Sequence, residues 1–335
     1  MKPNSEGAAA LGVDVEKLSS LDAVIKSEYS NINGIVAVRN GVTVYESYYN
    51  GFGPDTAHHV ASVTKSIVSA LIGIAIDRKY IENADAKVLD FFPEYVADAD
   101  AGVKREITIR HLLTMTAPYA FEDWREPLDQ MCMNPDWVQY ALDIMGLNGT
   151  LGAFKYSTAG AHLLSAIITR ATGKSAREFA NEQLFKPIGM REIPDYTLTS
   201  FGFDQLFGSE VKGWVNDPHK HSTGGWGLTL TPRDMALFGQ LYLNRGEWDG
   251  QPVISQSWVD ESTAMNANQY GYLWWVREEN GVLAYSAVGD GGNVICCVPE
   301  KELVVAIASG FLPHAPDRWP LIRDWIIPAV SDDKE

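Results

Sequence analysis

The sequence is poor in cysteine, in positive charge and in long apolar runs. Its 335 residues include only three cysteines, Cys132 and the adjacent Cys296 and Cys297, which are too few and too unevenly spaced for a disulfide framework or a zinc site. Neighbouring strand residues point to opposite faces, so the adjacent pair is expected to be ordinary strand residues. No run of about 18 apolar residues and no hydrophobic signal core occurs, so we expect a cytoplasmic protein without a membrane span.

Negative charge exceeds positive charge. Asp and Glu number 43 against 27 Lys and Arg, a formal net charge of −16. Such a chain repels phosphate backbones and anionic lipid surfaces, which argues against nucleic acid or a membrane as a partner. Hydrophobic residues make up 46% of the sequence, enough to fill the core of one large or two small domains.

The most informative motif is Ser62-Val-Thr-Lys65. Residues 62–77 are apolar on nearly every face, which predicts a buried helix. Ser62 falls at its N-terminus, where free N–H groups and the helix dipole stabilise negative charge. Lys65 lies one turn later on the same face, so its amine can approach the serine hydroxyl. The motif therefore predicts a serine nucleophile.

A plainer interpretation is that Ser62 is an ordinary helix N-cap and Lys65 a solvated side chain. The apolar neighbours of Lys65 argue against it, because a buried amine requires polar partners. An amine with the usual pKa of about 10.4 is almost fully protonated at pH 7, so a third group should assist. Tyr156, in Tyr156-Ser-Thr158 just before a predicted helix over 159–171, is the best candidate. We expect Lys65 and Tyr156 to act together as the base; which of them is the resting base stays open.

These motifs resemble those of the serine β-lactamase and penicillin-binding-protein superfamily, in particular its class C-like branch, which also contains esterases, D-amino-acid peptidases and amide hydrolases. Ser62 and Lys65 match its Ser-x-x-Lys box, and Tyr156-Ser-Thr158 matches its Tyr-x-Asn box with Thr158 in the asparagine position. Further stretches match the branch in the same order along the chain: 109–116, 224–235, 238–244 and 285–307. The resemblance implies one β-lactamase-like domain over residues 1–335.

The third box of the family, Lys-Thr-Gly or His-x-Gly, corresponds here to Asp290-Gly291-Gly292, followed by Asn293. An acid in place of the cation should repel an anionic β-lactam, and the loss of the amide at Thr158 points the same way. The resemblance implies an oxyanion hole made by the N–H groups of Ser62 and Asn293, beside glycines that let a substrate carbonyl approach. A simple glycine-rich hairpin turn is the alternative.

The expected fold is α+β, an α/β sandwich whose antiparallel sheet is built from both chain ends. The sheet part is predicted to comprise residues 1–80 and 266–335, and a mainly helical part residues 81–265. Alternating apolar residues around Asn-Gly pairs predict hairpins. The predicted strands are 35–39, 42–47, 272–276, 282–288, 294–298 and 303–309, with a closing helix over 319–327.

Two further groups of residues have candidate binding roles. Trp226, within a glycine-rich stretch, is favoured as a pocket residue, and one of the neighbouring Trp274 and Trp275 is expected in the core. His219, His221 and Asp217 are possible metal ligands, but no third histidine or further carboxylate follows at a spacing characteristic of a metal site. A polar loop is therefore favoured, and no metal or cofactor is expected.

The predicted function is two-step acyl transfer to water from a small ester or amide, through an acyl-enzyme on Ser62. Two alternatives remain. One is a true β-lactamase or D-alanyl-D-alanine carboxypeptidase, and the other is a non-catalytic binding protein on the same scaffold. The sequence indicates no oligomeric state.

Overall fold

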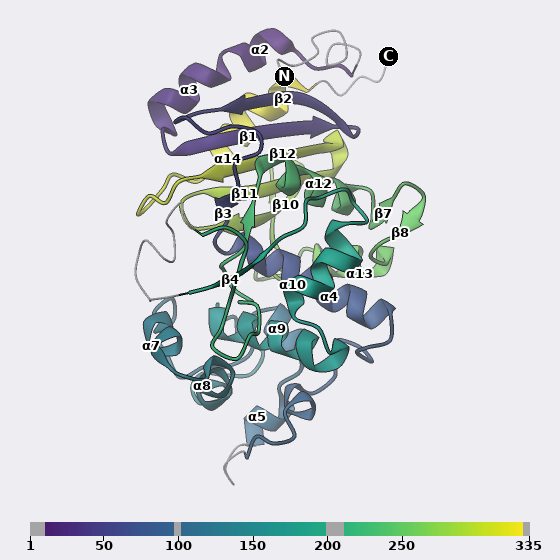
Figure 1. Cartoon of the computed structure of the whole chain (residues 1–335). Coiled ribbons are helices and arrows are strands. Elements are labelled where there is room, and N and C mark those ends of the chain that lie inside the picture. The colour runs from purple at the N-terminus through teal and green to yellow at the C-terminus, as the bar shows by residue number, and fades with distance from the viewer. Residues whose placement is uncertain (1–10, 97–101, 199–210, 331–335) are drawn as a thin grey trace.

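A six-stranded antiparallel sheet forms the centre of the computed structural model, which describes residues 11–96, 102–198 and 211–330 (Figure 1). The strand order is β2-β1-β12-β11-β10-β9, and β1 pairs with β12, so the two chain ends meet inside the sheet. This confirms the predicted α+β architecture. The strands are β1 (Ile32–Arg39), β2 (Val42–Tyr48), β9 (Trp275–Glu279), β10 (Val282–Gly289), β11 (Asn293–Val298) and β12 (Leu303–Ser309).

The hairpins predicted from Asn-Gly pairs are present. Asn40 and Gly41 have φ of 50° and 75°, and Asn280 and Gly281 have φ of 54° and 79°, the left-handed pair that a two-residue hairpin requires. The strand predicted over 272–276 was placed too early. Leu273 has a φ of 60°, which is incompatible with an extended strand, so β9 begins only at Trp275.

Helices cover both faces of the sheet. On one face, α2 (Val15–Ser19), α3 (Leu21–Glu28) and the C-terminal turns α14 (Trp319–Leu321), η4 (Ile322–Ile326) and η5 (Ile327–Ala329) pack against alternate strand residues such as Val305. On the other, α4 (Val63–Asp77) and α12 (Pro232–Leu243) pack against residues such as Val304. Cys296 and Cys297 face opposite layers as free thiols, as predicted.

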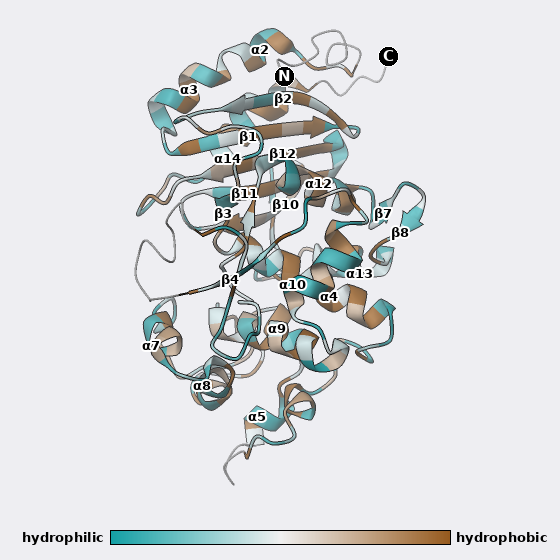
Figure 2. Cartoon of the chain, viewed as in Figure 1, coloured by the Kyte–Doolittle hydropathy of each residue, from teal (hydrophilic) through white to brown (hydrophobic). Residues whose placement is uncertain are grey.

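The helical part lies below the sheet in Figure 1, with α9 at its centre in contact with α4, α6, α8 and α10. Although α12 falls within 81–265, it packs on the sheet. Brown segments in Figure 2 mark apolar residues, which are frequent on the strands and on α4 and α9. The remaining helices are η1 (Val88–Phe91), α5 (Gly102–Glu106), α6 (Ile109–Leu113), α7 (Leu128–Met133), α8 (Trp137–Ile144), α9 (Thr158–Thr172), α10 (Ala176–Ala180), η2 (Asn181–Phe185), α13 (Gln256–Ser262) and η3 (Pro299–Lys301).

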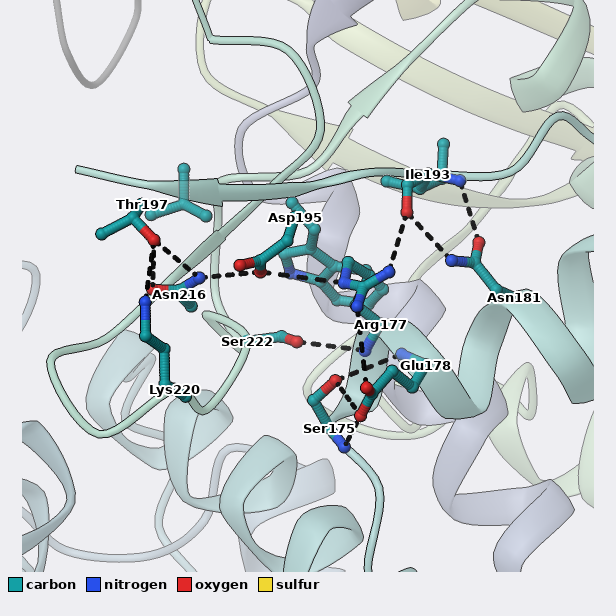
Figure 3. A network of polar contacts seen from close by, with 12 residues as sticks. Ser175, Arg177, Glu178, Asn181, Ile193, Asp195, Thr197, Asn216, Lys220 and Ser222 are labelled. Atoms are coloured by element: carbon teal, nitrogen blue, oxygen red, sulfur yellow. Dashed lines mark hydrogen bonds and ion pairs between the residues drawn. The ribbon is translucent and has the colours of Figure 1, made fainter.

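A polar network joins α10 to two short strands, β4 and β5 (Figure 3). Arg177 Nη1 and Asn181 Nδ2 both donate to the carbonyl oxygen of Ile193, at 3.2 and 2.9 Å. The backbone N–H of Arg177 donates to Ser222 Oγ at 3.0 Å, which fixes the start of the loop that carries Gly225.

The short strands are β3 (His58–His59), β4 (Asp195–Thr197), β5 (Trp214–Asn216), β6 (Thr229–Leu230), β7 (Glu247–Trp248) and β8 (Gln251–Pro252).

None of the helices in the described ranges has the length and apolar character needed to cross a bilayer.

Candidate active site

Ser62 lies at the entrance of α4 with its hydroxyl unused by the helix. The preceding Ala61 has a φ of 47°, rare for a residue with a Cβ, so the chain turns sharply into the helix. Ser62 is the N-cap residue, yet its side chain accepts no capping hydrogen bond. Its Oγ instead lies 3.0 Å from the Nζ of Lys65. This differs from an ordinary N-cap serine, whose oxygen accepts a bond from the first helical turn.

Lys65 is buried, with an exposed fraction of 1%, which excludes the solvated lysine considered above. Its Nζ donates to the carbonyl oxygen of Gly225 at 2.8 Å and lies 3.0 Å from the hydroxyls of both Ser62 and Thr158. A carbonyl only accepts, whereas a hydroxyl donates or accepts. The contacts therefore suit both an ammonium that donates three bonds and a neutral amine that accepts the proton of Ser62.

Tyr156 approaches this amine with the face of its ring. The Nζ of Lys65 is 4.8 Å from the ring centroid, a cation–π distance. The ring is stacked on Trp124 at 5.3 Å and on Trp275 at 6.1 Å between centroids. The structure thus brings Tyr156 to Lys65, and its contact with the amine is through the ring.

The end of β10 passes against the N-terminus of α4. A Cβ on Gly289 would lie 2.2 Å from the carbonyl oxygen of Val60 and 3.0 Å from the backbone nitrogen of Ser62, so only glycine permits this approach. The carbonyl oxygen of Gly289 accepts the N–H of Gly292 on the β11 side. Because the peptide bond is trans, the N–H of Asp290 points the opposite way, away from the N–H of Gly292.

Asn293 is not among the residues that line the cleft over Ser62. It begins β11, which is enclosed by β10 and β12. Its side chain is 2% exposed, donates to the carbonyl oxygen of Asp290 at 2.8 Å and accepts the N–H of Ser309 at 3.0 Å. The side chain of Asn293 therefore ties the turn to the start of β11 and the end of β12.

A cleft of about 810 Å³ opens over Ser62 and brings most of the sequence-predicted residues together. Trp275 lines it while Trp274, just before β9, is fully buried, so one of the two lies in the core. The predicted residues in its walls are Ser62, Tyr156, Thr158, Trp226, Asp290, Gly291 and Gly292. Asn293 lines a neighbouring cavity of about 400 Å³, which shares Asp290 and Phe311 with the cleft.

Glu126 is a site residue that sequence reasoning missed. Its carboxylate accepts the N–H groups of Thr158 at 2.5 Å and Ala159 at 2.6 Å, at the N-terminus of α9, and lines the cleft. Burial raises the pKa of Glu126, whereas these N–H groups and the charge of Lys65 oppose the rise. Its segment between two predicted helices had no periodicity that would single it out.

Arg318 is a second missed residue. Its guanidinium is 1% exposed and lies behind the turn after β10. Its Nε donates to the carbonyl oxygen of Gly292 at 3.2 Å, and its Nη2 donates to that of Gly291 at 3.1 Å and to Asn31 Oδ1 at 2.7 Å. Burial lowers the pKa of Arg318 to about 10. The cation thus holds the turn in place from behind.

The loop around His219, predicted to be polar, is partly buried. Asp217 is buried and lies 3.1 Å from His162 Nε2 and 2.9 Å from His221 Nδ1, while His219 is exposed. In the part of the chain that the structure describes, no three His, Cys, Asp or Glu side chains are grouped as metal ligands.

Comparison with known proteins gives the same assignment as the motifs. The model of the family described as Beta-lactamase matches residues 27–324. The chain is 23% identical over 330 residues to the 6-aminohexanoate-dimer hydrolase of Paenarthrobacter ureafaciens, covering 89% of this chain and 78% of that protein.

Solved structures share the fold. The octameric penicillin-binding protein homologue from Pyrococcus abyssi aligns with a TM-score of 0.70 at 19% identity, over 95% of this chain and 79% of its own. EstCE1, a hydrolase with promiscuous acyltransferase activity, aligns with a TM-score of 0.68 at 18% identity, over 93% and 99%. The chain therefore belongs to the Beta-lactamase family. Within that family it is a serine hydrolase.

Proposed function

We propose that the protein hydrolyses a small carboxylic ester or amide through an acyl-enzyme on Ser62. The observation that carries this proposal is the 3.0 Å contact between the buried Nζ of Lys65 and the Oγ of Ser62, a hydroxyl that does not cap its own helix. A nucleophile next to a base that other groups hold in place is the arrangement that covalent catalysis requires.

In the proposed first step, Ser62 Oγ attacks the carbonyl carbon and its proton passes to the Lys65/Tyr156 pair. The N–H groups of Ser62 and Asp290 donate to the oxyanion, since Gly289 brings them to the same edge of the cleft. Within the described ranges neither N–H has an acceptor in the protein. The bond to the leaving group then breaks, and the leaving group takes the proton back from the pair.

In the second step, water attacks the acyl carbon and gives a proton to the same pair, and Ser62 Oγ leaves and recovers a proton. Asp290 disfavours an anionic β-lactam in this cleft, because two like charges repel. The 6-aminohexanoate-dimer hydrolase and EstCE1 among the relatives support hydrolysis and acyl transfer at such a site.

The first experiment is intact-protein mass spectrometry after incubation with a fluorophosphonate probe, on the native protein and on Ser62→Ala. We expect one adduct on the native protein and none on the variant, together with a burst of one p-nitrophenol per Ser62 from a short-chain p-nitrophenyl ester. The absence of any adduct on either protein would favour a non-catalytic binding protein instead.

A chromogenic cephalosporin tests the remaining alternative. Stoichiometric acylation or turnover of the cephalosporin faster than of the neutral ester would identify a β-lactamase or D-alanyl-D-alanine carboxypeptidase. We expect the neutral ester to react faster.

A further inference from the structure

The cleft over Ser62 is acidic. The charged side chains in its walls are the carboxylates of Glu126, Asp290 and Asp317, and its walls include no lysine or arginine among the described residues. Lys65 lies beneath Ser62, and its amine is already held by Gly225, Thr158 and Ser62. A substrate entering this cleft therefore meets negative charge.

The three carboxylates differ in what already binds them. Glu126 accepts backbone N–H groups of α9. Asp317 lies 3.5 Å from Arg277 and accepts the N–H of Trp319. Asp290 is exposed, and its carboxylate has no hydrogen bond or ion pair with any described residue. Asp290 is thus the carboxylate available to a substrate.

Arg318 does not compensate the charge of Asp290 from within the cleft. Arg318 is buried behind the turn, and its N–H groups donate to carbonyl oxygens and to Asn31 and Ser309. Its N–H groups support the backbone of the turn, while Asp290 is exposed to solvent.

An aromatic wall faces the same space. Trp124, Tyr156 and Trp275 are mutually stacked, with centroids 5.3 to 6.4 Å apart. All three line the cleft, as do Trp226 and Phe311. Aromatic faces attract cations, most strongly when the cation has lost water, and Tyr156 already shows this with Lys65. The wall and Asp290 therefore favour the same kind of ligand.

We infer that the substrate carries a positive charge, an ammonium or quaternary ammonium group a few bonds from the reacting carbonyl, and that Asp290 and the aromatic wall select it. This inference rests on the proposed function of Ser62. The net charge of −16 acts in the same direction, because it raises the local concentration of cations around the protein.

The test uses three p-nitrophenyl esters of equal length and shape, those of 4-(trimethylammonio)butyrate, 5,5-dimethylhexanoate and 4-sulfobutyrate, which are cationic, neutral and anionic. We expect kcat/KM for the cationic ester to exceed that for the neutral one by about 10- to 30-fold, and the anionic ester to be slowest. The preference should shrink at high ionic strength. A second pair of substrates, acetylthiocholine and 3,3-dimethylbutyl thioacetate, places the charge on the leaving-group side. A preference for the cationic over the neutral substrate in either series supports the inference.

Variants assign the preference to Asp290. Asp290→Asn keeps the backbone N–H but removes the charge, so the cation-to-neutral ratio of kcat/KM should fall towards one, and Asp290→Lys should favour the sulfonate. Asp249→Asn, at the distant β7–β8 turn, removes the same charge outside the cleft and should leave the ratio unchanged.

Two failures are distinguishable. Hydrolysis of the neutral esters with a burst on Ser62, but with cationic and neutral members equally fast in both series or the sulfonate fastest, overturns the inference and leaves the proposed function intact. Absence of fluorophosphonate labelling and of any ester hydrolysis overturns both.

Discussion

The Nζ of Lys65 donates a 2.8 Å hydrogen bond to the carbonyl oxygen of Gly225, 160 residues further along the chain. A Cβ at position 225 would lie 2.3 Å from Thr158 Cγ2 and 3.2 Å from the amine itself. Glycine is thus required for the carbonyl to reach the amine. Two hydrogen bonds hold the residues just before Gly225: Trp214 Nε1 donates to Thr223 O at 2.8 Å, and Ser165 Oγ donates to Ser222 O at 2.5 Å.

The first prediction follows from that contact. Gly225→Ala should lower kcat by about 10- to 100-fold, because displacement of the amine by a fraction of an ångström misaligns the base. The double variant Gly225→Ala/Thr158→Ser removes the methyl group that the new Cβ would strike but keeps the hydroxyl near Lys65, so it should recover much of the loss. Steady-state ester hydrolysis is the measurement, with Thr158→Ser as the control. Equal kcat for Gly225→Ala and the native protein would show that the Gly225 contact does not position Lys65.

The sequence predicted the elements whose signals are local. The apolar pattern after Ser62 predicted the helix. The alternating strands around the Asn-Gly pairs predicted the sheet and its assembly from both chain ends. The subdomain limits stay a prediction, since α12 within 81–265 packs on the sheet. The direction of the Asp290 N–H depends on a hydrogen bond accepted by the preceding carbonyl, and the roles of Glu126 and Arg318 depend on contacts with residues far along the chain. Such contacts leave no periodicity or spacing to read in a single sequence.

The second prediction concerns Arg318. Arg318→Met should destabilise the protein by about 3 kcal/mol, because the amide oxygen of Asn31 loses its donor and the carbonyl oxygens of Gly291 and Gly292 each lose one of two donors. It should also lower kcat more than it changes KM, since the turn that presents the Asp290 N–H is loosened. Urea unfolding and ester kinetics measure the two effects. Arg323→Met, which removes a solvent-accessible arginine paired with Glu279, is the control and should change the free energy of unfolding little, because exposed ion pairs contribute little to stability.

The third prediction concerns Glu126. In Glu126→Gln the amide nitrogen cannot accept the N–H groups at the start of α9, so Thr158 shifts relative to Lys65 and kcat/KM should fall by about tenfold or more. Burial raises the pKa of Glu126, so the native rate should decrease as the pH is lowered through that raised pKa, and the variant should lack this decrease. Glu122→Gln, which removes an exposed partner of Arg125, is the matched control. A pH profile that is unchanged in Glu126→Gln would exclude this role.

The last prediction is a pH dependence of stability that arises at His59. Burial lowers the pKa of His59 to about 4, and its Nε2 accepts the N–H of Gly227 at 3.0 Å. The unfolded chain, with an ordinary pKa of about 6.5, takes up a proton that the folded protein does not. The stabilisation is therefore fully present above about pH 6.5 and is lost as the pH falls towards 4.

Between pH 8 and pH 5 this loss amounts to about 2 kcal/mol. His59→Gln keeps an acceptor for the Gly227 N–H but does not titrate, so its free energy of unfolding should fall by about 2 kcal/mol less than that of the native protein over the same interval. Urea unfolding at pH 8, 7, 6 and 5 gives the comparison, with the exposed His314→Gln as a control that follows the native curve. Parallel curves for the native protein and His59→Gln would mean that His59 keeps its proton when the protein folds, and that the hydrogen bond to Gly227 does not form.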